Sequence, residues 1–360
     1  MTILWLNLAI VFSLSFFTRY FAKPVYSSFS ITSISYNKLF ALATLVSLTL
    51  VAGLRSNIGD TYFYKYAYEI NDFTWEQVKE KENIGFWILQ MILKRFSEDP
   101  QILIFTTAAI TNILIVLIFL KYSRQFELST FVYITGGLYL VSMNGLRQVL
   151  TAAIVFTATR FIISGNFIAY ALVVLFASTF HESALILLPI YFLVRFKPWS
   201  KATIMLLVVA VVIVIGFDQF STILFSSLEE TQYGHYKDFQ EGGANVIRVA
   251  VFGAPLLVAF LGKEKLREIF PESDYIVNMS LIGLVFMIVS TQNWIFARFS
   301  LYFTLYQLVL VAWIVKLFKQ KEQRLVYLGI IVFYFLFYYY ESVISLNINY
   351  KSDYITFLSS

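Results

Sequence analysis

Apolar runs alternate with short polar connectors along almost the whole chain. The runs fall near residues 3–18, 38–54, 100–120, 128–143, 149–163, 167–180, 183–194, 202–217, 246–262, 276–292, 299–315 and 325–340. A helix needs about 20 apolar residues to cross a bilayer, so we expect the shorter runs to extend into the polar residues at their ends. The pattern predicts an all-α polytopic membrane protein with about twelve transmembrane helices, folded as a single integral membrane domain over residues 1–360.

A thirteenth apolar run, residues 84–96, is too short to span the bilayer comfortably. Its polar side chains Asn83, Gln90 and Lys94 lie on one face of the helix that it would form. A helix with this pattern is expected to lie along the membrane surface, with its apolar side chains toward the lipid. We therefore interpret residues 55–99 as an outer segment that contains one interfacial helix, and residues 218–245 as a second outer loop.

The distribution of charge orients the predicted spans. With twelve crossings and both termini outside, most of the 27 basic residues fall in the inner connectors and most of the 22 acidic residues fall outside. This agrees with the positive-inside rule, which would fail between Lys121 and Lys201 if residues 84–96 crossed the membrane. The orientation places the polar residues discussed below on the outer face.

Composition excludes several classes of function. Only 14% of the residues are charged, and the chain has no cysteine and two histidines. Disulfides, thiolate metal sites and His-rich metal sites are therefore not expected. No Asp-x-Asp motif and no phosphate-binding glycine loop is present, so we expect neither a metal nor a cofactor. The basic residues lie between spans, which argues against a nucleic-acid partner, and the lack of an internal repeat weakens a transporter with inverted repeats.

The strongest candidate site lies between the runs 128–143 and 149–163. Asn144, Arg147, Gln148 and Thr151 have the spacing i, i+3, i+4, i+7, which places them on one stripe of a continuous helix. Arginine suits phosphate because it is always charged and presents a planar fork of donors. The alternative is an arginine that extends to the membrane interface for solvation alone, but an amide on either side favours a binding site.

Other candidates lie at span ends on the same predicted face. His181 ends a run, and its titration near neutral pH suits a general base, although a single histidine is more often a packing residue. Arg55 and Asp60 belong to a segment rich in tyrosine that suits sugar stacking or an interfacial belt. Arg298 is followed by tyrosines at i+4 and i+8. In the loop 218–245, His235 and Tyr236 are the most site-like residues, although the loop could equally be a plain solvated one.

Several polar motifs, in order along the chain, resemble the EpsG family of bacterial Wzy-like exopolysaccharide polymerases. They are GLRSNIGDTYFY (53–64), SEDPQILIF (97–105), SMNGLRQ (142–148), RFIISGN (160–166), FHESALILLPIYFLVR (180–195), YGHYKDF (233–239) and IFARFSLYFTLYQ (295–307). The resemblance implies a GT-C-like or Wzy-like helical bundle in the bacterial cytoplasmic membrane. It also implies polymerisation of lipid-linked repeat units in biofilm polysaccharide synthesis, alongside a flippase and a chain-length regulator.

Together these features suggest a metal-independent glycosyltransferase acting on polyprenyl-pyrophosphate-linked oligosaccharide at the outer face. In this hypothesis the arginines at 147 and 298 hold the pyrophosphate, and the amides at 144 and 148 add hydrogen bonds. The histidine at 181 is a base or a pyrophosphate ligand, and the pair at 55 and 60 organises the acceptor. Three alternatives stay open: a flippase or transporter of the same lipid-linked sugar, an acyltransferase that modifies the polysaccharide, and a non-catalytic scaffold.

Overall fold

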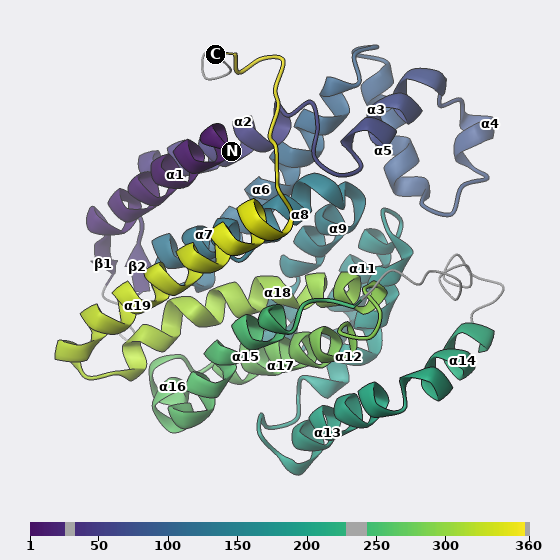
Figure 1. Ribbon diagram of the computed structural model, residues 1–360. Helices are drawn as coiled ribbons and strands as arrows, with labels where there is room; N and C mark the ends of the chain where they lie inside the picture. The colour runs from purple at the N-terminus through teal and green to yellow at the C-terminus, as the bar shows by residue number, and fades with distance from the viewer. Residues whose placement is uncertain (26–32, 228–242, 357–360) are drawn as a thin grey trace. The chain divides into compact units, whose positions relative to one another are not determined.

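The computed structural model describes residues 1–25, 33–227 and 243–356 and is almost entirely helical (Figure 1). The chain forms two compact units. Unit 1 comprises residues 1–188 and 311–360, and unit 2 comprises residues 189–310. The prediction of one integral membrane domain stays a prediction.

Unit 1 contains the first eleven α-helices and the C-terminal one. Their bounds are α1 Thr2–Tyr20, α2 Lys38–Gly53, α3 Thr61–Ile70, α4 Trp75–Val78, α5 Ile84–Lys94, α6 Gln101–Tyr122, α7 Phe126–Thr135, α8 Leu138–Asn144, α9 Leu146–Phe156, α10 Thr159–Ser164, α11 Phe167–Ser178 and α19 Gln320–Tyr339. Three shorter helical turns are η1 Glu182–Ile186, η3 Val315–Leu317 and η4 Tyr340–Ser345. Strands β1 (Lys23–Val25) and β2 (Ser33–Ser35) form a short antiparallel pair in which Lys23 lies opposite Ser35.

Unit 2 is built from the helices between these segments. They are α13 Lys201–Ile215, α14 Phe217–Ser227, α15 Val246–Leu261, α16 Lys263–Ile269 and α17 Ser273–Val289. Helices α12 (Leu187–Leu193) and α18 (Ile295–Ile314) each cross the boundary between the units. The first part of the predicted outer loop 218–245 is thus helical, as α14.

The predicted apolar runs all fall on helical segments, which confirms an all-α polytopic membrane protein. Within the described residues, five stretches are long and apolar enough to cross a membrane: Thr2–Tyr20, Gln101–Tyr122, Leu146–Ser164, Ile295–Leu317 and Gln320–Ser345. Two bent pairs, α7 with α8 and α15 with α16, raise the number to seven if each pair is one span. The other apolar helices have 10–17 residues, so the count of about twelve spans is not confirmed.

Glycines explain why some predicted runs are broken. The run 128–143 divides into α7 and α8, which meet at 55°. Gly137 precedes α8 with a φ of 90°, a left-handed conformation that side chains with a Cβ rarely adopt. Gly145 then separates α8 from α9. The expectation of one continuous stripe from Asn144 to Thr151 is therefore wrong, because Asn144 ends one helix and Arg147 begins the next.

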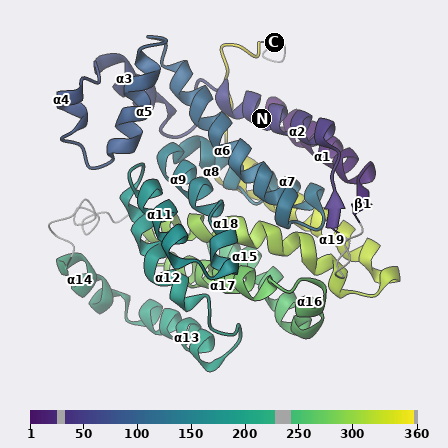
Figure 2. The ribbon, with the colours of Figure 1, turned by 180° about the vertical axis from the view of Figure 1, so that it is seen from behind.

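Helices α1, α2, α6 and α7 pack side by side in unit 1, as both views show (Figure 2). At one end the backbone N–H of Asn37 donates to the Thr18 carbonyl at 3.2 Å. Near that end Arg19 pairs with the fully buried carboxylate of Glu127 at 2.6 Å. At the other end Gln101 donates through Nε2 to the Gly53 carbonyl at 2.5 Å. We call this second end, where α2 ends and α6 begins, the site end of unit 1.

Candidate functional site

Arg55 is buried at the site end of unit 1, where its side chain binds several neighbouring segments. Its side chain is only 1% exposed. Nε donates to Thr61 Oγ1 at 2.9 Å, Nη2 donates to the Met143 carbonyl at 2.6 Å, and Nη1 donates to the Ala52 carbonyl. Burial lowers the pKa of Arg55 to about 10, so the guanidinium keeps its charge at neutral pH. Arg55 thus joins the end of α2 to the start of α3 and the end of α8.

The turn after Arg55 presents Asp60 to the junction of α8 and α9. Gly59 has a φ of 52°, and a Cβ at this position would overlap the side chain of Asn144. The close approach allows the backbone N–H of Asp60 to donate to Asn144 Oδ1 at 3.0 Å. Glycine is therefore required here for its backbone conformation and for its small size.

The C-terminal residues 349–352 fasten the same turn, and we call them the C-terminal strap. The backbone N–H of Ser56 donates to the Lys351 carbonyl at 2.9 Å. Asn57 closes the contact on both sides: its Oδ1 accepts from the Lys351 N–H at 2.7 Å, and its Nδ2 donates to the Asn349 carbonyl at 2.5 Å. Asn57 thus couples the far end of the chain to the turn that carries Asp60.

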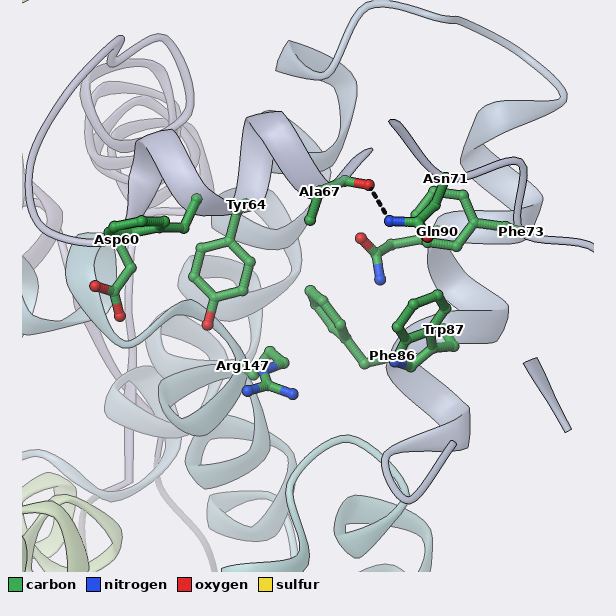
Figure 3. A pocket seen from close by; sticks show the side chains of 10 residues that line it. Asp60, Tyr64, Ala67, Asn71, Phe73, Phe86, Trp87, Gln90 and Arg147 are labelled. Atoms are coloured by element: carbon green, nitrogen blue, oxygen red, sulfur yellow. Dashed lines mark hydrogen bonds between the residues drawn. The ribbon is translucent and has the colours of Figure 1, made fainter. Parts of the chain in front are cut away.

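A cavity of about 370 Å³ opens beside this turn, within unit 1 (Figure 3). We call it the first cavity. Aromatic rings and amides make most of its wall, with one carboxylate and one guanidinium among the described lining residues. The lining residues are Asp60, Phe63, Tyr64, Ala67, Asn71, Phe73, Phe86, Trp87, Gln90 and Arg147. An apolar and aromatic wall with a few convergent polar groups is typical of ligand sites, and volumes from about 300 Å³ are usual.

Arg147 lines the first cavity and has unused hydrogen-bonding capacity. Its Nε is buried and finds no hydrogen-bond partner among the described residues. The guanidinium carbon lies 5.8 Å from the centre of the Phe86 ring, and Figure 3 shows the Tyr64 hydroxyl directed toward the same guanidinium. Buried polar atoms are nearly always paired in folded proteins, so an unpaired arginine donor at a cavity indicates a place for an anionic ligand.

His181 is brought to the site end by a contact between α5 and the end of α11. The N–H of Gly85 donates to the Thr179 carbonyl at 2.8 Å. A Cβ at Gly85 would overlap Thr179 Oγ1, so the contact requires glycine. Phe180 then packs against the cluster that contains Phe86. His181 follows directly, although it is not among the residues that line the first cavity.

The backbone contact of His181 with Ser183 favours one tautomer of the imidazole. Nδ1 accepts from the backbone N–H of Ser183 at 3.4 Å and lies 2.8 Å from Ser183 Oγ. When Nδ1 is an acceptor, the neutral imidazole carries its proton on Nε2. His181 in this state is suited to donate a hydrogen bond through Nε2 rather than to accept a proton there.

The remaining predicted residues are not gathered at the first cavity. Gln148 is buried on α9 and does not line the cavity. Arg298 belongs to unit 2, where its guanidinium lies 4.4 Å from the centre of the Trp294 ring, so its pairing with Arg147 stays a prediction. His235 and Tyr236 lie outside the described residues. No group of three or more metal-ligating side chains was found among the residues that the structure describes.

Sequence reasoning did not single out most of the cavity wall. Tyr64, Asn71, Phe86 and Trp87 line it, and of these only the tyrosine stood in a motif noted for sugar stacking. Gln90 was noted as part of a polar face on the helix 84–96. The structure points this side chain into the cavity (Figure 3). The polar face of α5 is the available signal, although the sequence pattern by itself predicts a helix that lies along the membrane surface.

Comparison with known proteins identifies a family for this chain. The family model described as EpsG family matches residues 38–352, which include both the turn after Arg55 and the C-terminal strap. No curated protein and no solved structure matches the chain significantly. The family match covers most of the chain and all of the first cavity, and on this ground the chain belongs to the EpsG family.

Proposed function

We propose that this protein joins polyprenyl-pyrophosphate-linked oligosaccharide repeat units at the outer face of the cytoplasmic membrane. Membership of the EpsG family implies, in general terms, a Wzy-like polysaccharide polymerase. The long apolar helices are those of a multi-pass membrane protein. The observation that carries the finer proposal is the buried, unpaired Nε of Arg147 at the edge of an aromatic cavity.

The reaction is a glycosyl transfer without a metal. The hydroxyl oxygen of the acceptor sugar bonds to the anomeric carbon of the donor, and the bond from that carbon to the pyrophosphate oxygen breaks. The pyrophosphate leaves with the electron pair, so negative charge develops on its oxygens. Arg147 stabilises that charge through Nε and the guanidinium fork. Tyr64 and the amides of Asn71 and Gln90 supply hydrogen bonds to the sugar, and Trp87 supplies an apolar face.

Asp60 is our candidate for the base that takes the acceptor proton. It is the one carboxylate among the described residues that line the first cavity, and it shares that cavity with Arg147. His181 is the weaker candidate, because its Nδ1 already accepts from Ser183. We assign His181 instead to donation from Nε2 to the pyrophosphate. A role as base and a role as hydrogen-bond donor predict different effects of a glutamine substitution at His181.

The other predicted residues receive indirect or additional roles. Arg55 and Asn144 position the turn that carries Asp60, since both make their hydrogen bonds to it or to its neighbours. Gln148 is buried in the first turn of α9. In the proposal, Arg298 is the second cation that binds the pyrophosphate, and Tyr236 contacts the acceptor. A flippase that delivers the repeat units and a chain-length regulator are the expected partners.

The test replaces Arg147 by alanine and by lysine in the host strain. Alanine removes all donors, and lysine restores the charge without Nε or the planar fork. One lost hydrogen bond to a charged group is worth about 1.5–3 kcal/mol, so we expect roughly ten- to a hundredfold less polymer from both variants. Arg160→Ala is the matched control, because Arg160 is exposed on α10 and does not line the first cavity.

Membrane levels of each variant are measured by immunoblot, and lipid-linked sugars are extracted in parallel. A polymerase defect leaves single repeat units on the outer leaflet. A flippase defect leaves them on the inner leaflet, and an acyltransferase defect leaves polymer of normal length without acyl groups. Normal polymer from both Arg147 variants at normal protein levels would refute the assigned role.

A further inference from the structure

A second cavity lies next to the first one in the outer segment of unit 1. Its volume is about 520 Å³, large enough for a small-molecule ligand. Its lining residues are Asp72, Phe73, Thr74, Trp75, Met91, Lys94 and Arg95. Phe73 also lines the first cavity, so the two cavities have a wall in common.

Phe73 is held as a rigid part of that common wall. Its side chain is 1% exposed, and its ring centre lies 5.2 Å from that of Trp87 and 5.7 Å from that of Tyr68. Its φ is 51°, in the left-handed region that residues with a Cβ rarely adopt. Packing on both sides maintains this strained backbone, and strain of this kind is concentrated at ligand sites.

Helix α5 runs along both cavities. Trp87 and Gln90 line the first cavity, Met91 and Lys94 line the second, and Arg95, directly after the helix, also lines the second. Positions 87 and 94 are two turns apart, which is about 10 Å along the helix axis. Helix α5 therefore presents side chains to two neighbouring cavities, one after the other along its axis. A ligand longer than one sugar could contact both.

The groups that line the second cavity are those that bind saccharides. Trp75 is 54% exposed and offers an indole face at the start of α4. The backbone N–H of Thr74 donates to Gln77 Oε1 at 3.3 Å, which fixes the N-terminus of this helix. Asp72 offers acceptors and Arg95 offers donors, both on exposed side chains. Aromatic faces pack on the C–H faces of sugars, and charged groups bind their hydroxyls.

Lys94 is already fixed in place. Its Nζ donates to the Tyr68 carbonyl at 3.0 Å and pairs with Glu98 at 2.7 Å. It therefore shapes the wall of the second cavity, and Arg95 is the more available donor. This division of roles makes Trp75 and Arg95 the residues to vary.

We infer that the second cavity is a saccharide-binding subsite for the same glycan whose pyrophosphate-proximal sugar occupies the first cavity. This inference rests on the proposed function. The subsite holds sugars farther from the lipid and so keeps the glycan in place between successive additions. Its loss lowers the affinity for the glycan and shortens the polymer, whereas loss of Arg147 slows bond formation itself.

The experiment compares Trp75→Ala, Trp75→Phe and Arg95→Ala in the full-length protein. Phe96→Ala and Lys79→Ala are the matched controls, because both residues are exposed on the same outer segment and line neither cavity. Polymer length is measured by gel filtration of the secreted polysaccharide. Binding is measured on purified protein in nanodiscs, with radiolabelled oligosaccharide obtained by partial hydrolysis of the host's own exopolysaccharide.

We expect Trp75→Ala to bind the oligosaccharide about three- to tenfold more weakly and to yield shorter polymer. We expect Trp75→Phe to recover most of the binding, Arg95→Ala to weaken it, and both controls to match the unmodified protein. Unchanged binding and polymer length in Trp75→Ala and Arg95→Ala would overturn the subsite while leaving the proposed function intact. Normal polymer from Arg147→Ala would refute the proposed role of that residue, and the binding measurement would still decide on the subsite.

Discussion

The side-chain carbonyl of Asn144 accepts a hydrogen bond from the backbone N–H of Asp60 at 3.0 Å. This bond joins the turn after α2 to the junction between α8 and α9. It lies between residues 84 positions apart in the sequence. Since Arg147 follows Asn144 by only three residues, across the junction at Gly145, the bond also sets how the carboxylate at 60 and the guanidinium at 147 face the same cavity.

Gly59→Ala should disturb the turn that carries Asp60 more than Asn144→Ala does. A methyl group at 59 overlaps the Asn144 side chain and also opposes the positive φ, whereas Asn144→Ala only removes one neutral hydrogen bond, worth about 1 kcal/mol. We expect severely reduced polymer from the first variant and roughly a fivefold loss from the second. The double variant relieves part of the overlap and should recover some activity relative to Gly59→Ala. Strict additivity of the two losses would argue against the contact.

Arg55→Gln should lower the stability of the folded protein, because Arg55 holds the structure around the site rather than taking part in the reaction. The substitution removes donors from Thr61 and from two buried carbonyls, and each unpaired buried group costs about 1–3 kcal/mol. Thermal unfolding of the purified protein in detergent is the measurement. Arg147→Ala is the comparison. Because the buried Nε of Arg147 has no hydrogen-bond partner among the described residues, its removal leaves no other group unpaired, and the unfolding temperature of this variant should be nearly unchanged. An Arg55→Gln variant that is inactive but fully stable would assign Arg55 to substrate instead.

His181→Gln should retain more activity than His181→Ala. The amide of glutamine places an N–H donor near the position of Nε2, but it cannot accept a proton as a base does. If His181 donates to the pyrophosphate, we expect the glutamine variant to make several times more polymer than the alanine variant. Equal and complete inactivity of the two variants, at equal membrane levels, would instead support a role as general base.

Truncation after Ile348 should inactivate the protein even though it removes no residue of the first cavity. It eliminates the C-terminal strap and therefore the partners of Ser56 and Asn57. Truncation after Thr356 is the control, because it keeps all of these bonds. Polymer yield and unfolding temperature are measured for both. Full activity after the longer deletion would show that the turn with Asp60 holds its shape unaided.

The outer location of the site can be tested by cysteine labelling, because the chain contains no cysteine. Lys79→Cys lies on an exposed position of the outer segment, and Lys321→Cys is exposed in a predicted inner connector. A membrane-impermeant maleimide added to intact cells should label the first and leave the second unlabelled until the cells are lysed. The reverse pattern would move the site to the cytoplasmic face.

The apolar pattern predicted the helices well but could not predict how far each one extends. The run ending near residue 143 looks continuous, yet it bends at Gly137, where the backbone adopts a φ of 90°. Hydrophobicity does not report backbone conformation, and a glycine within an apolar run is compatible with a straight helix, a bend or a break. For the same reason Asn144 and Arg147 were placed on one helix, and Gly145 separates them.

In the candidate site, the residues that could be predicted are those whose signal lies in nearby sequence positions, and contacts between distant positions could not be predicted. Arg147 could be identified from its type and its polar neighbours. The burial of Arg55 could not, because its three acceptors include the carbonyl of Met143, which is distant in sequence. The contact between Gly85 and Thr179 likewise could not be predicted from the sequence. Partners of this kind are set by packing between helices, and a single sequence carries no signal for them.

The C-terminal strap has a consequence for the order of biosynthesis. Helices α2 and α6 leave the ribosome early, and domains generally fold from the N-terminus during synthesis. The turn with Asp60 nevertheless receives its partners from residues 349 and 351, which are translated long after it. The cavity beside this turn is therefore completed only after helix α19 has been inserted, so a chain that stops before residue 349 lacks a finished site.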